Sequence, residues 1–442
     1  MITWAYGLFL ITIMLIFFYD RIKYKRIWYD PLYFFLSFML LYVSPLSLRY
    51  IYQLPIKGNV TPYFYDIAEV FPYSLALTNI AMLIFYIIYL LSPTIQWQKY
   101  RLINHNQHNY TILNKISYVL FLLGLLILFL STQSFGGIKK LLSMGYSVTT
   151  VLSQQPIISL AINIMISASF IMMTTYAISK KKHHFLSSLL MIVPCFIMLI
   201  IMSRRAELIV WTTTYILFYS LSIKPIRFKL ILPFLLMGFI TLNILGLSRI
   251  CYANKNNISL IQCVVQENKK VGTFYTLTTG QFAVPYETLP VLMKFNNEPL
   301  RYGSTLTDIV VQWIPRIIYP EKDYGLTTWY YHKFYNPNAP INEGRTFFFL
   351  SEGYLNFGVM GIFIWAALWG LFWKNIAYLQ KYNNFLFYFI FSIYTSSMII
   401  LIPNHSAGLF VSIVKTYILW FLLPYLLYLV LIHIKSKEEC IK

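Results

Sequence analysis

Residues 72–91 read PYSLALTNIAMLIFYIIYLL, a stretch of 20 residues without a charged side chain. A helix of about 20 apolar residues spans the hydrocarbon core of a bilayer, which is roughly 30 Å thick. Lipid offers no hydrogen-bond partner to the backbone, so such a segment is helical unless it belongs to a closed barrel. The run is continuous and does not alternate with polar residues as a barrel strand does, so it predicts a transmembrane helix.

Similar runs recur along the whole chain. The 442 residues are 58% hydrophobic and 11% charged, a composition that excludes a soluble domain of this length. We predict an all-α polytopic membrane protein with about eleven transmembrane helices. The predicted spans are residues 2–19, 31–49, 72–91, 116–130, 157–178, 185–202, 208–223, 230–247, 349–373, 385–402 and 408–432.

The predicted spans divide the chain into three segments. Residues 1–248 form an N-terminal bundle of about eight helices, and residues 349–442 hold about three more and a tail. Between them, residues 249–348 contain no apolar run long enough to cross a bilayer and form a large loop with short amphipathic helices. One such helix is expected on the membrane surface at 305–318, where apolar residues recur at helical spacing. These residues are Leu306, Ile309, Val310, Trp313 and Ile317.

The formal net charge of +20 lies mostly in short connections between the predicted spans. An excess of Lys and Arg in short connections marks the cytoplasmic side of a membrane. The basic cluster at residues 21–26, directly after the first span, therefore places the N-terminus and the large loop outside and the C-terminus inside. The same distribution argues against nucleic-acid binding, which needs positive residues gathered on one soluble surface. The first apolar run has no basic start, so no cleavable signal peptide is expected.

Cations from separate parts of the chain reach the predicted outer face. Arginine at a membrane boundary is often an anchor whose head extends to the interface, and this is the simpler interpretation of any single one. As a set, planar guanidinium groups suit a diphosphate, because each donates two charge-assisted hydrogen bonds to phosphoryl oxygens. The expected diphosphate-binding set is Arg204, Arg205, Arg249, Arg316, Lys322 and Arg345, with Lys333 and Lys415 as further candidates.

Acidic side chains in the same regions are candidates for proton transfer. Glycosyl transfer needs a base that takes the proton of the attacking hydroxyl, and a carboxylate can do this. The catalytic candidates are Glu352 and Glu343, with Arg316 stabilising charge beside them. For Glu352, which lies at the mouth of a span, structural capping is an equal alternative. The other acids near these positions are Glu207, Glu287, Glu321 and Asp323.

The cysteines and histidines do not form a metal-binding pattern. No cluster has the spacing of metal ligands, and no glycine-rich phosphate loop is present, so no metal and no cofactor is expected. Cys251 and Cys263 share the large loop. They form a disulfide if the loop faces an oxidising compartment, and free thiols are an equal alternative.

Two stretches resemble the O-antigen and oligosaccharide repeat-unit polymerases of bacterial envelopes, the Wzy type. They are residues 314–322, IPRIIYPEK, and residues 351–361, SEGYLNFGVMG. The layout is similar as well, with many spans, one large external loop and an arginine-bearing hairpin at 203–205 before it. The chain departs from the pattern at Asp323, where the family has a second proline.

The resemblance implies a C-type glycosyltransferase-like fold and a metal-independent enzyme of the bacterial inner membrane. Such an enzyme transfers a growing glycan from undecaprenyl diphosphate to an incoming lipid-linked repeat unit, and so extends O-antigen for lipopolysaccharide. The implied partners are the lipid-linked oligosaccharide, membrane lipid and, as a further candidate, a chain-length regulator. In the implied roles, one set of cations holds the two diphosphates and Glu352 or another loop acid acts on the acceptor hydroxyl. The cations are Arg204 or Arg205, Arg249, Arg316 and Arg345.

Three alternatives stay open at this point. An O-antigen ligase uses the same donor and is poorly separated from a polymerase by sequence. A flippase for lipid-linked oligosaccharides needs charges along a path across the membrane, whereas Lys415 is almost the only ionisable residue within the predicted spans. A non-enzymatic chain-length regulator predicts heptad repeats in the external part, and the large loop contains none.

Overall fold

A computed structural model describes the chain apart from residues 29, 54–62, 64, 93–109, 134–135, 138–155, 202–204, 228, 231–232, 234–237, 239, 241–243, 245–246, 248–250, 252–259, 272–283, 313, 315–317, 320–324, 341–342, 383–393, 396, 398–405, 418–425 and 432–442. The described residues form helices, turns and irregular segments and contain no strand, which confirms the helical class. Seven of the described helices are long and apolar enough to cross a membrane.

These seven helices coincide with predicted spans. They are α1 (Ile2–Tyr24), α2 (Pro31–Tyr52), α3 (Phe71–Leu91), α4 (Tyr110–Gln133), α7 (Pro156–Ser179), α8 (Lys182–Ile201) and α16 (Phe349–Tyr382). The predicted span at 208–223 is also helical, as α9 (Arg205–Ser222). The spans predicted at 230–247 and 385–402 lie largely outside the described residues, and that at 408–432 is described in part, by α18 (Ser406–Tyr417) among others. The number eleven therefore stays a prediction.

Shorter helices make up much of the predicted large loop. They are α11 (Leu260–Val271), α13 (Val284–Phe295), the 3-10 helix η2 (Ser304–Leu306), α14 (Asp308–Val311) and α15 (Leu326–Phe334). The helix predicted at 305–318 begins as η2 and α14, two short pieces in place of one continuous helix. Two of its predicted apolar residues, Trp313 and Ile317, lie outside the described residues.

By packing, the chain divides into two compact units. The first unit is Met1–Gln98, Gln266–Tyr382 and Met398–Ile413, and the second is Lys99–Val265, Asn383–Ser397 and Val414–Lys442. This division differs from the three consecutive segments that the sequence predicts. Most of the predicted loop belongs to the first unit, because its helices bury their apolar sides against the membrane-spanning helices of that unit.

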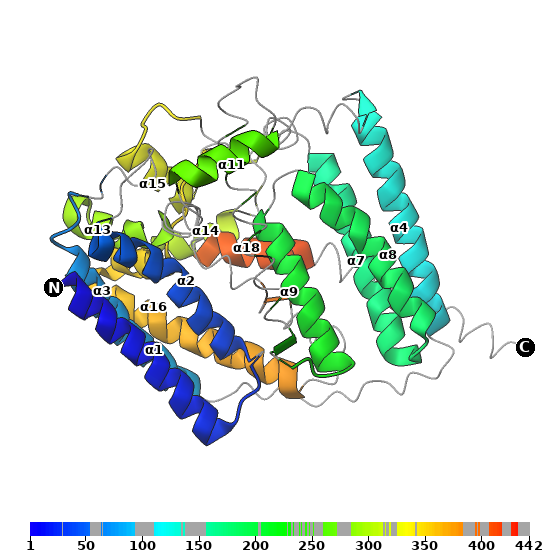
Figure 1. The fold of residues 1–442 in the computed structure, drawn as a ribbon, viewed down its shortest axis with the longest axis horizontal. Helices are drawn as coiled ribbons and strands as arrows, with labels where there is room; N and C mark the ends of the chain where they lie inside the picture. The colour runs from blue at the N-terminus through cyan, green and yellow to red at the C-terminus, as the bar shows by residue number, and fades with distance from the viewer. Residues whose placement is uncertain are drawn as a thin grey trace, which may run out of the picture. The chain divides into compact units, whose positions relative to one another are not determined.

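In the first unit, α1, α2, α3 and α16 lie side by side (Figure 1). Phe35 of α2 stacks on Phe85 of α3 with 3.9 Å between ring centroids. Gly370 of α16 faces the carbonyl oxygen of Phe85, and a Cβ at this glycine would lie only 2.6 Å from that oxygen. A residue without a side chain therefore sets how closely α16 and α3 approach, as small residues commonly do between membrane helices.

A buried carboxylate fastens the C-terminal end of α1 to its neighbours. Asp20 accepts hydrogen bonds from the hydroxyls of Tyr33 at 3.0 Å and Tyr86 at 3.3 Å, which belong to α2 and α3. Arg26 forms an ion pair with the same carboxylate at 3.0 Å. The charge of Asp20 is thus balanced inside the bundle, as a buried ionised group requires.

The loop helices share one hydrophobic core with α16. Its buried residues come from α13, α15, the start of α16, the residues just before α16 and the segment before α3: Ile67, Val291, Leu292, Leu326, Tyr330, Phe334, Phe347 and Leu355. Burial of apolar surface stabilises a fold by about 25 cal/mol per Å² of area removed from water. The burial of this cluster therefore holds the loop helices against α16. The loop is therefore a packed part of the first unit.

In the second unit, α4 packs against α7, α7 against α8, and α8 against α9. Small residues lie at these contacts. The hydroxyl of Ser117 donates to the carbonyl of Ala168 at 2.6 Å, and the hydroxyls of Ser169 and Ser188 each donate to the other residue's carbonyl, at 2.8 and 2.9 Å. Polar contacts between apolar helices of this kind replace the hydrogen bonds that lipid cannot provide.

The helix α16 is broken near its N-terminal end. Phe357 and Gly358 have non-helical backbone angles, and Gly358 has a φ of +63°. A positive φ is accessible to glycine at little cost, which makes this position suited to the break. On either side of it, Gly353 and Gly361 approach so closely that a Cβ on either one would overlap the other's carbonyl oxygen. The sequence predicts an unbroken span at 349–373, and the structure instead shows a sharp bend within it.

We expect Gly361→Ala to reduce the amount of folded protein strongly. The added methyl group would meet the backbone of Gly353, which cannot move aside as a flexible side chain can. Overpacking of this kind costs about 1–3 kcal/mol or more. The measurement is the yield and melting temperature of the detergent-purified protein. Gly7→Ala is the matched control, since nothing lies within 4 Å of a Cβ there, and equal losses in both variants would contradict the prediction.

Candidate functional site

The break in α16 is occupied by loop backbone. Carbonyl groups in the last turn before a helix ends lack helical partners and must find others. Here the carbonyl of Leu355 accepts from the backbone N–H of Arg301 at 3.1 Å, and that of Asn356 accepts from Tyr302 at 3.0 Å. The side-chain oxygen of Asn356 accepts from the N–H of Gly303 at 2.8 Å. A turn of the large loop is thus seated in the bend of a membrane-spanning helix.

Glu352 lies one turn before the break and is completely buried. Its Oε1 accepts from the hydroxyl of Thr305 at 3.0 Å, and its Oε2 accepts from the backbone N–H of Ser406 at 2.6 Å. Asn356 donates from Nδ2 to the Thr305 hydroxyl oxygen and to the Glu352 carbonyl, both at 2.8 Å. One carboxylate therefore joins the large loop, α16 and the first residue of α18.

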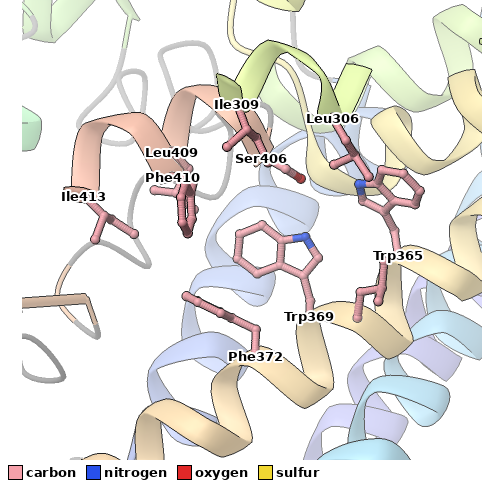
Figure 2. Close-up of a pocket in the computed structure, with 10 residues that line it drawn as sticks. Leu306, Ile309, Trp365, Trp369, Phe372, Ser406, Leu409, Phe410 and Ile413 are labelled. Carbon is pink, nitrogen blue, oxygen red and sulfur yellow. The ribbon is translucent and has the colours of Figure 1, made fainter. Parts of the chain in front are cut away.

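An apolar pocket of about 170 Å³ lies beside this group of hydrogen bonds. The pocket has three walls, whose side chains project toward one another (Figure 2). The first wall is formed by η2 and α14, the second by α16 and the third by α18. Among the described residues that line it, only Ser406 is neither aliphatic nor aromatic. The lining consists of Leu306, Ile309, Trp365, Leu368, Trp369, Phe372, Ser406, Leu409, Phe410 and Ile413. Such a lining suits a hydrocarbon chain and offers little to a sugar or phosphate.

The pocket accounts for two residues of the amphipathic helix that the sequence predicts. Leu306 and Ile309 line it, although Leu306 is still 38% exposed, and the prediction has both side chains on the membrane surface. Val310 is 68% exposed and remains available to lipid. The predicted apolar face therefore lies in part on the pocket, and its residues Trp313 and Ile317 lie outside the described part of the chain.

A second buried charged group lies between α13 and the segment before α16. Arg345 donates from Nη2 to Oε2 of Glu287 at 2.9 Å, and Tyr335 donates to Oε1 at 2.9 Å. The Arg345 guanidinium also lies 4.1 Å from the ring centroid of Tyr335. Glu287 is fully buried and the side chain of Arg345 is 12% exposed. Arg345 thus holds the loop together through protein partners.

Burial and charge act in opposite directions on this pair. Burial raises the pKa of the Glu287 carboxyl, and the charge of Arg345, the hydroxyl of Tyr335 and the charge of Arg49 oppose that rise without cancelling it. Burial lowers the pKa of Arg345, but the Glu287 carboxylate together with Tyr335 and Tyr330 outweighs it, and the net direction is upward. The carboxyl is therefore the partner whose charge is more easily lost.

The structure describes only some of the predicted site residues. Glu352 is buried and Arg345 partly buried in the first unit, and Glu343 is exposed. Arg205 begins α9 in the second unit, and Lys415 belongs to α18. The cations Arg204, Arg249, Arg316 and Lys322 lie outside the described residues, as do Glu321 and Asp323. The convergence of guanidinium groups that the sequence predicts therefore stays a prediction.

Two further arginines lie near these residues, Arg49 near Glu287 and Arg301 at the bend of α16. Arg49, at the end of α2, is buried and acts electrostatically on Glu287. Arg301 lies 4.4 Å over the ring of Trp329 and 3.8 Å from Glu298. The place of Arg49 at the outer end of a predicted span was a usable signal. For Arg301 no sequence signal exists, because its place depends on the turn seated in α16.

The cysteines and the possible metal ligands complete the description of the polar side chains. Cys251 and Cys263 form a disulfide, with 5.8 Å between their Cα atoms. Cys195 is free and buried. Among the residues that the structure describes, no group of three His, Cys, Asp or Glu side chains could hold a metal ion.

The chain was compared with known protein families, curated proteins and solved structures. The chain matches no family model, no curated protein and no solved structure.

Proposed function

We propose that the protein is a polymerase that joins oligosaccharide repeat units carried on undecaprenyl diphosphate, at the outer face of the bacterial inner membrane. The observation that supports this most directly is the apolar pocket between α14, α16 and α18. It lies along a membrane-spanning helix and beside the sequence 351–361, so that a hydrocarbon chain in the pocket has its polar end near the large loop. A substrate that combines a long prenyl chain with a polar head matches such a site.

The reaction is the transfer of a glycan from one lipid to another. A hydroxyl oxygen of the acceptor repeat unit attacks the anomeric carbon of the donor glycan. The bond from that carbon to the diphosphate oxygen breaks, undecaprenyl diphosphate leaves with the bonding electrons, and a base takes the hydroxyl proton. The main requirement is to stabilise negative charge on the leaving diphosphate, which fixed guanidinium groups do in a partly dry site. In the proposal this is the work of Arg249 and Arg316, together with the other predicted cations.

The acceptor base in this proposal is an acid of the large loop. Glu343 is exposed and so accessible to a hydroxyl, whereas Glu352 is buried behind the pocket wall. Binding energy from the prenyl chain and from the repeat-unit sugars holds the two substrates in position for the attack.

The disulfide between Cys251 and Cys263 supports an external position for the segment that carries it. Disulfides persist in the bacterial periplasm and are rare in the cytosol. This agrees with the orientation expected from the basic connections, with the large loop in the periplasm and the C-terminus in the cytoplasm.

Deletion of the gene tests the function directly. We expect the deletion strain to lose long surface glycan chains and to retain single repeat units on its lipopolysaccharide, because only the joining of units is blocked. A gel of the extracted lipopolysaccharide shows this difference, and a plasmid copy of the gene is the control that restores the ladder. Loss of both long chains and single units would instead indicate a ligase or a flippase and contradict the proposal.

A further inference from the structure

We infer that Glu352 is a positioning residue that holds two walls of the apolar pocket, the wall of η2 and α14 and the wall of α18, at a fixed separation. We also infer that it is not the base of the reaction. The inference rests on the proposed function for the identity of the lipid in the pocket. It concerns a residue for which the sequence left a catalytic and a structural role open.

The carboxylate of Glu352 bridges the two walls. Thr305, which donates to Oε1, directly precedes the wall residue Leu306. Ser406, whose N–H donates to Oε2, is the first residue of α18 and itself lines another wall. Figure 2 shows Leu306 and Ser406 on separate elements near one end of the pocket. One side chain from α16 thus bonds to both walls at once.

The orientation of these bonds is fixed from behind. Asn356 donates to the oxygen of Thr305 at 2.8 Å, so the proton of that hydroxyl is directed to Glu352. The same asparagine receives the N–H of Gly303 and so holds the turn that leads to Thr305. The series from Asn356 through Thr305 to Glu352 and Ser406 is a connected network in which every member has a partner, the kind that specifies one arrangement.

The same geometry is unsuitable for a general base. A base must come within hydrogen-bond reach of the proton that it removes. The Glu352 side chain has no exposed surface, and each of its oxygens already accepts from a protein donor. The pocket beside it has an almost wholly apolar lining among the described residues, which offers little to a sugar hydroxyl.

Two substitutions of Glu352 distinguish a positioning role from a catalytic one. In Glu352→Gln, the amide oxygen can accept from the Ser406 N–H and the amide nitrogen can donate to the Thr305 oxygen. The bridge then survives without a group that could act as a base. In Glu352→Leu, a side chain of comparable bulk makes neither bond, and both walls lose their common anchor.

The first experiment measures turnover in purified membranes with undecaprenyl-diphosphate-linked repeat units extracted from the deletion strain. We expect Glu352→Gln to keep kcat/KM within about threefold of the wild type, because donor and acceptor exchange roles in the bond to Thr305 and no hydrogen bond is lost. We expect Glu352→Leu to raise KM by about tenfold or more with a smaller change in kcat, as loss of substrate binding does. The matched pair Thr305→Ser and Thr305→Val should repeat this contrast, because only serine keeps the hydroxyl.

The second experiment measures binding of a prenyl diphosphate in the pocket and does not depend on glycan transfer. Membranes are illuminated with a diazirine-bearing farnesyl diphosphate, and the labelled peptides are identified by mass spectrometry. We expect label on peptides of α16 and α18 that line the pocket in the wild type and in Glu352→Gln, and at least a fivefold loss in Glu352→Leu. Equal amounts of each variant in the membrane are confirmed by immunoblot.

The outcomes separate the inference from the proposed function. If Glu352→Gln is as inactive as Glu352→Leu while its pocket is labelled normally, the carboxylate takes part in the chemistry and the inference is overturned, but the polymerase remains. If the wild type is labelled in the pocket but joins no repeat units, the proposed function fails, and the contrast in labelling between Gln and Leu still decides the role of Glu352. Equal labelling of Gln and Leu variants would overturn the bridge between the walls.

Discussion

Cells whose only copy of the protein carries Arg316→Ala or Arg249→Ala are expected to place normal amounts of protein in the membrane and yet to make no long glycan chains. Each of these residues is predicted to donate a planar pair of charge-assisted hydrogen bonds to a diphosphate. Removing one preorganised donor that stabilises developing charge typically lowers the rate on the order of 10²–10³-fold. The lipopolysaccharide of both mutants should therefore show single repeat units on a gel.

Two control variants sharpen this result. Arg227→Ala removes an exposed arginine of a connection that is predicted to be cytoplasmic, and it should leave the ladder intact. Arg316→Lys keeps the charge but not the planar fork, so it should recover part of the chain length. Normal ladders in both alanine mutants would end the assignment of these arginines to a diphosphate.

Loss of the buried partner Glu287 is expected to be more damaging than loss of Arg345. Breaking a buried ion pair by removing one member typically costs about 3–5 kcal/mol, because the other charge is left without compensation. In Glu287→Ala the remaining guanidinium cannot lose its proton. In Arg345→Ala the remaining carboxyl, whose pKa burial already raises, becomes neutral by binding a proton.

This difference gives the Arg345→Ala variant a distinct dependence on pH. Its folded form binds a proton at Glu287 under conditions where the unfolded chain has lost it, because the folded pKa lies above the ordinary value of 4.5. Stability from this proton is fully present below the unfolded pKa and is lost as the pH rises through the folded pKa. Melting temperatures in detergent should therefore rise in Arg345→Ala as the pH is lowered toward the ordinary carboxyl pKa of 4.5, and should not rise in Glu287→Ala.

A surface pair provides the comparison for these two variants. Glu298 and Lys333 also form an ion pair, at 2.5 Å, but their side chains are 38% and 26% exposed. Exposed pairs contribute about 0–1 kcal/mol, so Glu298→Ala should change the melting temperature little. If Glu298→Ala and Glu287→Ala were equally destabilising, burial would not be the cause of the larger effect.

For the described part of the chain, the sequence was sufficient to locate the seven helices that are long and apolar enough to cross a membrane. A span predicted at 72–91 is observed at Phe71–Leu91, and one predicted from residue 31 begins at Pro31. Hydropathy carries this information, because each apolar run must cover the thickness of the bilayer by itself. The assignment needs no knowledge of what a helix packs against.

The contacts that form the candidate site could not be predicted in the same way. Glu352 meets Ser406 across 54 positions, and Glu287 meets Arg345 across 58. Such pairings depend on how the helices pack, which no local pattern specifies. The bend at Gly358 was also hidden, because glycine is frequent in membrane helices that are not broken. The predicted division into consecutive segments failed to anticipate the two units for the same reason.

The bond between Glu352 and Ser406 also bears on the order in which the protein is made. The ribosome delivers the turn at 301–305 and the helix α16 before it delivers α18. One wall of the pocket can therefore dock while synthesis continues, and the other is added only after Ser406 has entered the membrane. A newly made chain consequently completes the apolar pocket only near the end of translation.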